Sequence, residues 1–208
     1  MQKIHSSELL LDTRSMLGEG PVWDVRKQVL FWVDIEGGVL HCLDPSTGKQ
    51  KQWSVGEMVG AAIPTEQGHM LLALETGLAT FHFDTETLDK HGVLRDFDPK
   101  MRYNDGKVGP NGDFWIGSMH KETEPEAGSL YRVDRHFQVE EKIGKTSISN
   151  GMAWTSDNKS FYYSDTATYE VWRFDYDIST GEISGCEVAF TIPEGYGGAD
   201  GMCIDAED

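Results

Sequence analysis

A short signature ending in glycine recurs along this chain at roughly 45-residue intervals, and each copy opens an apolar run. The five copies are Glu19-Gly20, Val59-Gly60, Asp105-Gly106, Asn150-Gly151 and Asp200-Gly201. A period of this size, built from short strands, is typical of the blades of a β-propeller. The fifth copy has only begun where the sequence ends at Asp208, so we expect most of a propeller and not all of one.

Each repeat divides into four runs rich in β-branched and aromatic residues, separated by turns of Gly, Asn, Asp and Ser. No stretch shows sustained helical periodicity. We therefore predict an all-β chain forming a single, incomplete propeller domain over residues 1–208. Its predicted blades are approximately 18–56, 57–98, 102–146 and 147–193, with the start of a fifth at 198–208. A β-sandwich is the structural alternative, although that fold has no reason to repeat four times in register.

The net charge of the chain limits the kinds of molecule that it is expected to bind. Asp and Glu number 35 against 18 Lys and Arg, which gives a net charge of −17. This acidity argues against nucleic acid and anionic membranes as partners. The sequence shows neither a signal peptide nor the ~20 apolar residues of a membrane helix. The three cysteines form no C-x-x-C pair that would suggest a zinc site. We expect a cytoplasmic protein, either a monomer or a weak oligomer.

The variable residues of the signatures are candidates for a metal site. In a four-stranded meander, the starts of the innermost strands and the loops between second and third strands share one face, so the signatures ring one mouth of the channel. If Glu19 and Asp200 converge there, their repulsion is about 4 kcal/mol at ~4 Å and an effective dielectric of 20, which calls for a proton or a cation. Two carboxylates with the Asn150 amide suit Ca²⁺, Mg²⁺ or Mn²⁺, and Zn²⁺ less naturally. The alternative is that Asn-Gly and Asp-Gly are ordinary turn dipeptides.

Four ordered motifs carry a resemblance to a known family. They are L-G-E-G-P-V-W at 17–23, R-Y-N-D-G-K at 102–107, S-N-G-M-A-W at 149–154 and D-G-M-C-I-D at 200–205. Together they resemble the SMP-30/gluconolactonase/regucalcin-like family, and the similarity covers the entire chain. The resemblance implies a six-bladed propeller with one divalent metal on the channel axis, of which this chain holds four blades and the start of a fifth. It also implies hydrolysis of sugar lactones.

The resemblance further implies roles for individual residues. It assigns the metal ligands to Glu19, Asn150 and Asp200, and Asp200 is also our candidate for the general base or water-orienting group.

Substrate contacts carry over to Arg102, Asn104 and Glu122. Glu122 lies in the long loop of residues 119–128, and the alternative for it is a solvated carboxylate. The alternative for Arg102 is a surface ion pair with Asp98 or Asp105. We expect Asp105 and Lys107 only to shape the turn.

The predicted function is metal-dependent hydrolysis of an aldonolactone to an aldonic acid, with a small-molecule sugar lactone as the partner. Three alternatives stay open: a non-catalytic calcium-binding or regulatory propeller, a propeller scaffold that recruits a protein partner, and a propeller hydrolase acting on another ester. Convergence of the ligands is expected to depend on closure of the ring, and so is the activity of a chain that holds only part of it.

Overall fold

The fold is all-β, as predicted, in a computed structural model that describes residues 8–92 and 98–205. Its strands form four four-stranded antiparallel sheets, and the described helical structure is one short 3-10 helix, η1 (Thr166–Thr168). In each sheet the strands follow one another in sequence order, which is the meander expected of a propeller blade. The prediction that the complete ring has six blades and the predicted domain boundaries remain predictions.

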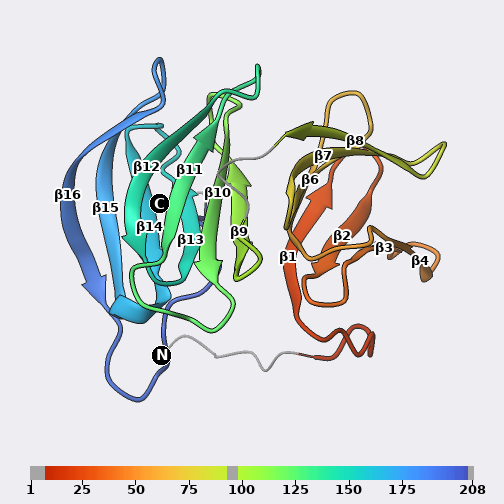
Figure 1. Cartoon of the computed structure of the whole chain (residues 1–208), viewed down its shortest axis with the longest axis horizontal. Helices are drawn as coiled ribbons and strands as arrows, with labels where there is room; N and C mark the ends of the chain where they lie inside the picture. The colour runs from red at the N-terminus through yellow and green to blue at the C-terminus, as the bar shows by residue number, and fades with distance from the viewer. Residues whose placement is uncertain (1–7, 93–97, 206–208) are drawn as a thin grey trace.

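Each sheet is formed by four strands that are consecutive in the sequence, and the four sheets follow one another along the chain (Figure 1). The first consists of β1 (Gly18–Asp24), β2 (Val29–Asp34), β3 (Val39–Asp44) and β4 (Lys49–Ser54). The second consists of β5 (Val59–Pro64), β6 (Met70–Leu74), β7 (Gly77–His82) and β8 (Thr87–Gly92). The third consists of β9 (Met101–Val108), β10 (Phe114–His120), β11 (Gly128–Val133) and β12 (Val139–Thr146). The fourth consists of β13 (Ser149–Trp154), β14 (Ser160–Asp165), β15 (Glu170–Asp177) and β16 (Glu182–Thr191).

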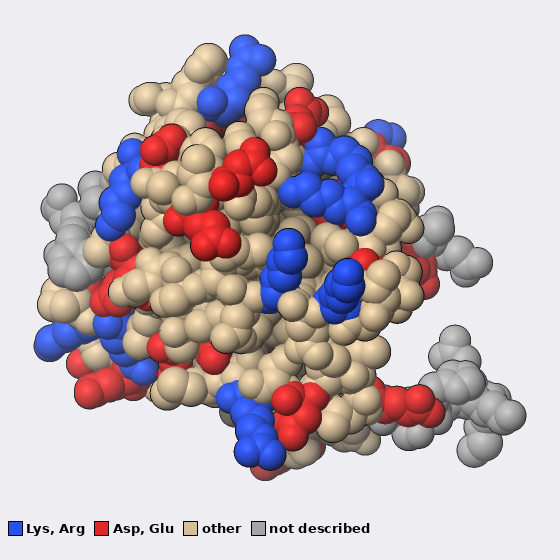
Figure 2. Space-filling view, turned by 90° about the vertical axis from the view of Figure 1, so that its right-hand side faces the viewer, with Lys and Arg blue, Asp and Glu red and all other residues tan. Residues whose placement is uncertain are grey.

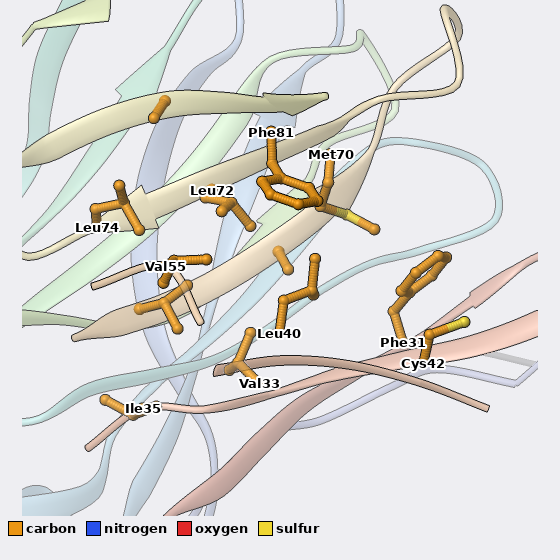
Figure 3. Packing of buried hydrophobic residues seen from close by; sticks show 13 residues of the cluster. Phe31, Val33, Ile35, Leu40, Cys42, Val55, Met70, Leu72, Leu74 and Phe81 are labelled. Atoms are coloured by element: carbon orange, nitrogen blue, oxygen red, sulfur yellow. The ribbon is translucent and has the colours of Figure 1, made fainter. Parts of the chain in front are cut away.

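Hydrophobic clusters fill the space between neighbouring sheets. Alternate residues of a strand face the same side of its sheet, so each sheet offers an apolar face to the next. Figure 3 shows Val33 and Leu40 of the first sheet pointing toward Leu72 and Phe81 of the second. A second cluster joins the second and third sheets, and a third joins the third and fourth. The innermost strands β1, β5, β9 and β13 contact one another in succession, which brings the signatures of separate repeats together.

A β-bulge lies at the signature in every sheet. The ladder register shifts between Glu19 and Val22 in β1, between Val59 and Ala61 in β5, and between Asn150 and Met152 in β13. In β9 the shift falls between Tyr103 and Gly106, opposite Ile116–Ser118 of β10. A bulge bends the strand locally and turns a side chain away from its regular direction. The recurring signature is therefore the sequence mark of a bulge that redirects one side chain per sheet.

The close approach of backbone segments from neighbouring repeats explains why glycine is required at two of the signature positions. A Cβ added at Gly60 would lie 2.6 Å from the carbonyl carbon of Tyr103 on the neighbouring innermost strand. A Cβ at Gly151 would collide with the carbonyl oxygen of Asp200, which belongs to the fifth repeat. Glycine at these two positions lets backbone segments from successive repeats pack directly against each other.

Charged side chains of both signs lie on the surface of the described residues (Figure 2). Acidic and basic side chains are interspersed on the side of the molecule seen in Figure 2. Among the described residues, no helix has the length and apolar character needed to cross a bilayer. The three cysteines are free thiols, with Cys42 buried and the other two exposed. The cytoplasmic location stays a prediction.

Candidate functional site

Side chains from the bulges of three of the four sheets meet around a small pocket between the innermost strands. Residues from four repeats line it: Glu19, Gly20, Ile35, Gly60, Asn104, Asp105 and Asn150. Its volume is about 10 Å³, which is room for roughly one water-sized sphere. The lining is rich in oxygen donors, since it holds two carboxylates and two side-chain amides. A pocket of this size and chemistry suits a single small cation or a water molecule.

The surroundings of Glu19 oppose its negative charge. Burial raises the pKa of Glu19 above its ordinary value of 4.5, and the carboxylates of Asp200 and Asp105 raise it further. The guanidinium of Arg102 acts on this pKa in the opposite direction without cancelling the rise. Carboxylates from the first, third and fifth repeats thus lie close enough to repel one another.

Asp105 belongs to the same group, although the sequence analysis expected it only to shape a turn. It lines the pocket beside Glu19. Burial raises the pKa of Asp105 and Asp200 adds to the rise, while Lys107 opposes it. The signal that could have identified Asp105 was present in the sequence, because it occupies the variable position of the third signature.

Asn150 is held by both ends of its amide. The side chain is 5% exposed at the bulge of β13. Its Nδ2 donates to Thr166 Oγ1 at 3.0 Å, and its Oδ1 accepts from the backbone N–H of Gly151 at 3.2 Å. The amide oxygen still has a second lone pair for another partner.

Arg102 and Asn104 form a connected pair on β9. Arg102 Nη1 donates to Asn104 Oδ1 at 2.6 Å and to the carbonyl of Tyr103 at 3.1 Å. Asn104 is buried and its Nδ2 donates to the carbonyl of Ser149 at 3.0 Å, which ties the third sheet to the fourth. Burial lowers the pKa of Arg102, and Glu36 and Glu19 oppose that effect. The acids that act on this guanidinium therefore differ from Asp98 and Asp105, the ion-pair partners that the sequence suggested.

The two remaining predicted residues are both exposed. Asp200 accepts a hydrogen bond from the N–H of Gly201 at 2.9 Å, and its charge reaches Glu19 and Asp105. Glu122 lies in the loop between β10 and β11, and its backbone N–H donates to His120 Nδ1 at 3.1 Å. Within the described parts of the chain, no hydrogen bond or ion pair joins the Glu122 side chain to a residue that lines the pocket. The structure thus gathers five of the six predicted residues and leaves Glu122 apart from them.

The chemistry of the donor set fits a hard divalent cation. Carboxylate and amide oxygens are the ligands that Ca²⁺, Mg²⁺ and Mn²⁺ prefer, and a cation would offset the mutual repulsion of the carboxylates. Within residues 8–92 and 98–205, no group of three or more His, Cys, Asp or Glu side chains is arranged to hold a metal ion. The predicted set of two carboxylates and one amide is not a group of that kind.

The family model described as "SMP-30/Gluconolactonase/LRE-like region" matches residues 17–208. The chain belongs to this family. The resemblance inferred from the four motifs is thereby confirmed. Regucalcin of Xenopus laevis is 32% identical over 205 residues, covering 96% of this chain and 69% of that protein. The 6-deoxy-6-sulfogluconolactonase of Pseudomonas putida is 35% identical over 200 residues, covering 92% of this chain and 66% of that protein.

A solved member of the family shares the fold. The crystal structure of regucalcin from Agrobacterium tumefaciens, described as a calcium-binding protein, superposes with a TM-score of 0.87 at 32% identity. The match covers 92% of this chain and 65% of that one. This chain therefore spans about two thirds of the length of the relatives that it matches.

Proposed function

We propose that this chain carries the catalytic mouth of a divalent-metal-dependent hydrolase that opens a sugar lactone to its aldonic acid. One observation supports the proposal above the others: oxygen donors from the first, third and fourth repeats line a pocket that holds about one water-sized sphere, and the Asp200 carboxylate of the fifth repeat raises the pKa of both Glu19 and Asp105. Family relatives named for lactone hydrolysis support the same reaction class.

Glu19, Asn150 and Asp200 would hold the metal ion. When bound, a divalent cation supplies Lewis-acid polarisation of a carbonyl and neutralises the clustered carboxylates. The position of Asn150 favours this role, because its Nδ2 is committed to Thr166 and its oxygen is the end left to face a cation.

The chain's own residues account for binding and proton transfer. The forked donors of Arg102 suit the hydroxyl groups and ring oxygen of a sugar lactone, and Asn104 holds that guanidinium through its Oδ1. Asp200 is exposed and free to accept the proton of the attacking water as its oxygen adds to the lactone carbonyl carbon. The ester C–O bond then breaks, and the proton passes to the ring oxygen that leaves. Glu122 would add an acceptor from the loop after β10.

The test measures the acid released from each lactone in a panel of sugar lactones by titrating it at constant pH. Metal-free protein is compared with protein given Mg²⁺, Mn²⁺, Ca²⁺ or Zn²⁺. We expect metal-dependent release that falls by at least ~100-fold in Asp200→Asn and Glu19→Gln, because each change replaces an anionic ligand with a neutral amide and Asp200→Asn also removes the base. Arg102→Ala is expected mainly to raise KM, by about tenfold. Full activity of Asp200→Asn or Glu19→Gln would contradict the assignment.

A calcium-binding propeller without catalysis is the second candidate, because a solved relative is described as calcium-binding. It predicts tight binding of Ca²⁺ with no acid release from any lactone. Release from a non-sugar ester alone would instead favour a hydrolase of the same architecture with another substrate.

A further inference from the structure

We infer that Thr166 is a positioning residue that orients the Asn150 amide and fixes the backbone that carries Asp200. This inference rests on the proposed metal site, because it concerns two of the three residues that would hold the ion. Thr166 lies outside all five signatures, and its hydroxyl connects the fourth repeat to the fifth.

The backbone of Thr166 is fixed relative to the start of β13. Thr166 begins η1 directly after Asp165, the last residue of β14. Its N–H donates to the carbonyl of Ile148 at 3.1 Å. The Asp165 carboxylate, 3% exposed, accepts from the backbone N–H groups of Ser147 and Ile148 at 2.7 and 2.8 Å. The Thr166 hydroxyl therefore projects from a rigid corner next to Asn150.

The Thr166 hydroxyl acts together with the Gly151 N–H, which donates to Asn150 Oδ1 at 3.2 Å, to select which way the Asn150 amide points. Thr166 Oγ1 donates to the carbonyl oxygen of Ala199 at 2.7 Å, and that oxygen can only accept. The hydroxyl must then accept its other hydrogen bond, which comes from Asn150 Nδ2 at 3.0 Å. The two ends of an asparagine amide are nearly the same size, so partners and not shape select its orientation. With the nitrogen committed to Thr166 and one lone pair of the oxygen to the Gly151 N–H, the second lone pair of the amide oxygen is available to a cation.

The same hydroxyl holds the segment that presents Asp200. Ala199 immediately precedes Asp200, so the bond from Thr166 anchors the peptide next to the proposed ligand. The packing is tight on both sides: a Cβ on Gly198 would lie 2.6 Å from the Thr166 carbonyl oxygen, and a Cβ on Gly151 would collide with the Asp200 carbonyl. One side chain thus couples Asn150 and Asp200, which belong to different repeats.

The experiment separates the hydroxyl from the bulk of the side chain. Thr166→Val keeps the volume and removes both hydrogen bonds, whereas Thr166→Ser keeps the hydroxyl and removes the methyl group. Ca²⁺ and Mn²⁺ are titrated calorimetrically into each metal-free protein. We expect Thr166→Val to weaken binding about 10- to 100-fold, as is typical when a residue that orients a ligand is lost, and Thr166→Ser to stay within about threefold of wild type. Thr166→Ala is a second hydroxyl-free variant, without steric risk against Gly198.

Thr168→Val is the matched control. Thr168 lies in the same short helix, and its hydroxyl also makes two hydrogen bonds, to the carbonyl of Asp165 at 2.8 Å and from the N–H of Glu170 at 3.2 Å. It has no bond to Asn150 or Ala199 among those of the described residues. We expect Thr168→Val to change the stability of the metal-free protein, measured by urea unfolding, while metal affinity is retained.

The outcomes keep this inference separate from the proposed function. If wild type binds Ca²⁺ or Mn²⁺ and both hydroxyl-free variants bind it equally well, the role of Thr166 is wrong and the metal site stands. An equal loss of affinity in Thr166→Ser and Thr166→Val would also overturn it, because the methyl group would then matter and not the hydroxyl. If wild type binds neither ion, the metal site itself is wrong and the inference falls with it.

Discussion

Glu19 is a residue whose environment favours its protonated form. The pKa of Glu19 is raised by burial and then by two neighbouring carboxylates, so the folded protein holds this proton more tightly than the unfolded chain does. Its contribution to stability is fully present below the ordinary pKa of 4.5 and is lost as the pH rises through the higher folded pKa. Above that range the ionised side chain destabilises the metal-free fold.

We predict that Glu19→Gln stabilises the metal-free protein at pH 7. The gain is at most on the order of 1 kcal/mol, because the side chain is only partly buried and water screens its charge. It should disappear at pH 4, where wild-type Glu19 is protonated in both states. Urea unfolding in a chelator at the two pH values measures the difference, and Glu66→Gln, an exposed glutamate, serves as the control. Lower stability of Glu19→Gln than of wild type at pH 7 would contradict the repulsion.

Asp34 shows the opposite behaviour. The carboxylate is 6% exposed and accepts from the N–H groups of Met16, Leu17 and Gly37 at 2.9, 2.9 and 3.1 Å. Burial alone would raise the pKa of Asp34, but these donors together lower it below 3.8. The stabilisation is therefore present above pH 3.8 and is lost as the pH falls through the folded pKa.

We predict that Asp34→Asn costs about 1–3 kcal/mol at pH 7, because the amide turns an N–H₂ group toward a backbone donor. The deficit relative to wild type should shrink as the pH falls below 3.8, where the wild-type carboxylate also becomes protonated. Urea unfolding between pH 3 and pH 7 measures it, with the exposed Asp12→Asn as control. A deficit that does not change with pH would show that charge is not its cause.

The sequence identified side chains that occupy repeated positions and missed those that act through them. Glu19, Asn150 and Asp200 each stand before a glycine at the same place in a repeat, so the period alone nominated them. For Asp105 the sequence predicts only a turn residue, because an Asp-Gly pair is also ordinary turn chemistry, and only the fold shows its burial. Thr166 could not be predicted, because its two partners lie 16 and 33 residues away along the chain.

At the scale of single elements, the bulge is what the sequence could not specify. Runs rich in β-branched and aromatic residues, together with turn residues, predicted four strands per repeat, and the four-stranded sheets confirm them. A bulge adds one unpaired residue to a strand, and short runs with mixed polarity do not reveal where the period of two is interrupted. The recurring glycine marked the place, but its meaning depends on the neighbouring strand that approaches it.

We predict that Gly151→Ala displaces the segment around Asp200. The added Cβ would overlap the Asp200 carbonyl oxygen and lie 2.8 Å from the Met202 side chain. Overpacking of this kind costs about 1–3 kcal/mol, measured by urea unfolding, and we expect at least tenfold weaker metal binding in calorimetry.

Gly144→Ala on the outer strand β12 is the matched control for Gly151→Ala. The nearest atom to a Cβ there is Glu141 Oε1 at 2.7 Å, the end of a flexible side chain that can move aside. We expect this variant to bind metal as wild type does. Normal metal affinity of Gly151→Ala would show that the packing of Gly151 does not set the position of Asp200.

At the scale of the whole molecule, apolar surface remains open beside the fourth sheet. Val188 and Phe190 on β16 are 50% and 56% exposed. Next to them a cleft of about 520 Å³ lies between the sheet and residues 199–204. Exposed apolar patches of this kind promote association.

We predict that this chain self-associates at high concentration, and that Phe190→Ser reduces the association several-fold by removing part of the apolar surface. Sedimentation velocity over a range of concentrations measures it. Tyr196→Ser, which removes an exposed aromatic ring outside the cleft lining, is the control. An equal effect of both variants would show that association does not depend on the cleft.

The sequence could predict the class of the whole molecule but not how the ring is completed. The period and the four strands of each repeat are local properties, and they can be read within about 45 residues. Closure depends on contacts between the first and last blades, and this chain spans about two thirds of its relatives' length. The blade count of six therefore stays a prediction that rests on the family resemblance.

Because of the bulges, the side chain that a repeat contributes to the site is independent of the backbone hydrogen bonds that hold its sheet together. The ladder hydrogen bonds run through the backbone, so the redirected side chain can differ from one repeat to the next while the sheet stays the same. Glu19 and Asp105 fill this position with carboxylates, Asn150 fills it with an amide, and Val59 fills it with a fully buried hydrocarbon. At the mouth of the molecule, each repeat therefore offers one position whose side chain can change without changing the sheet. Evolution could retune such a site by single substitutions, one blade at a time, without redesigning the scaffold.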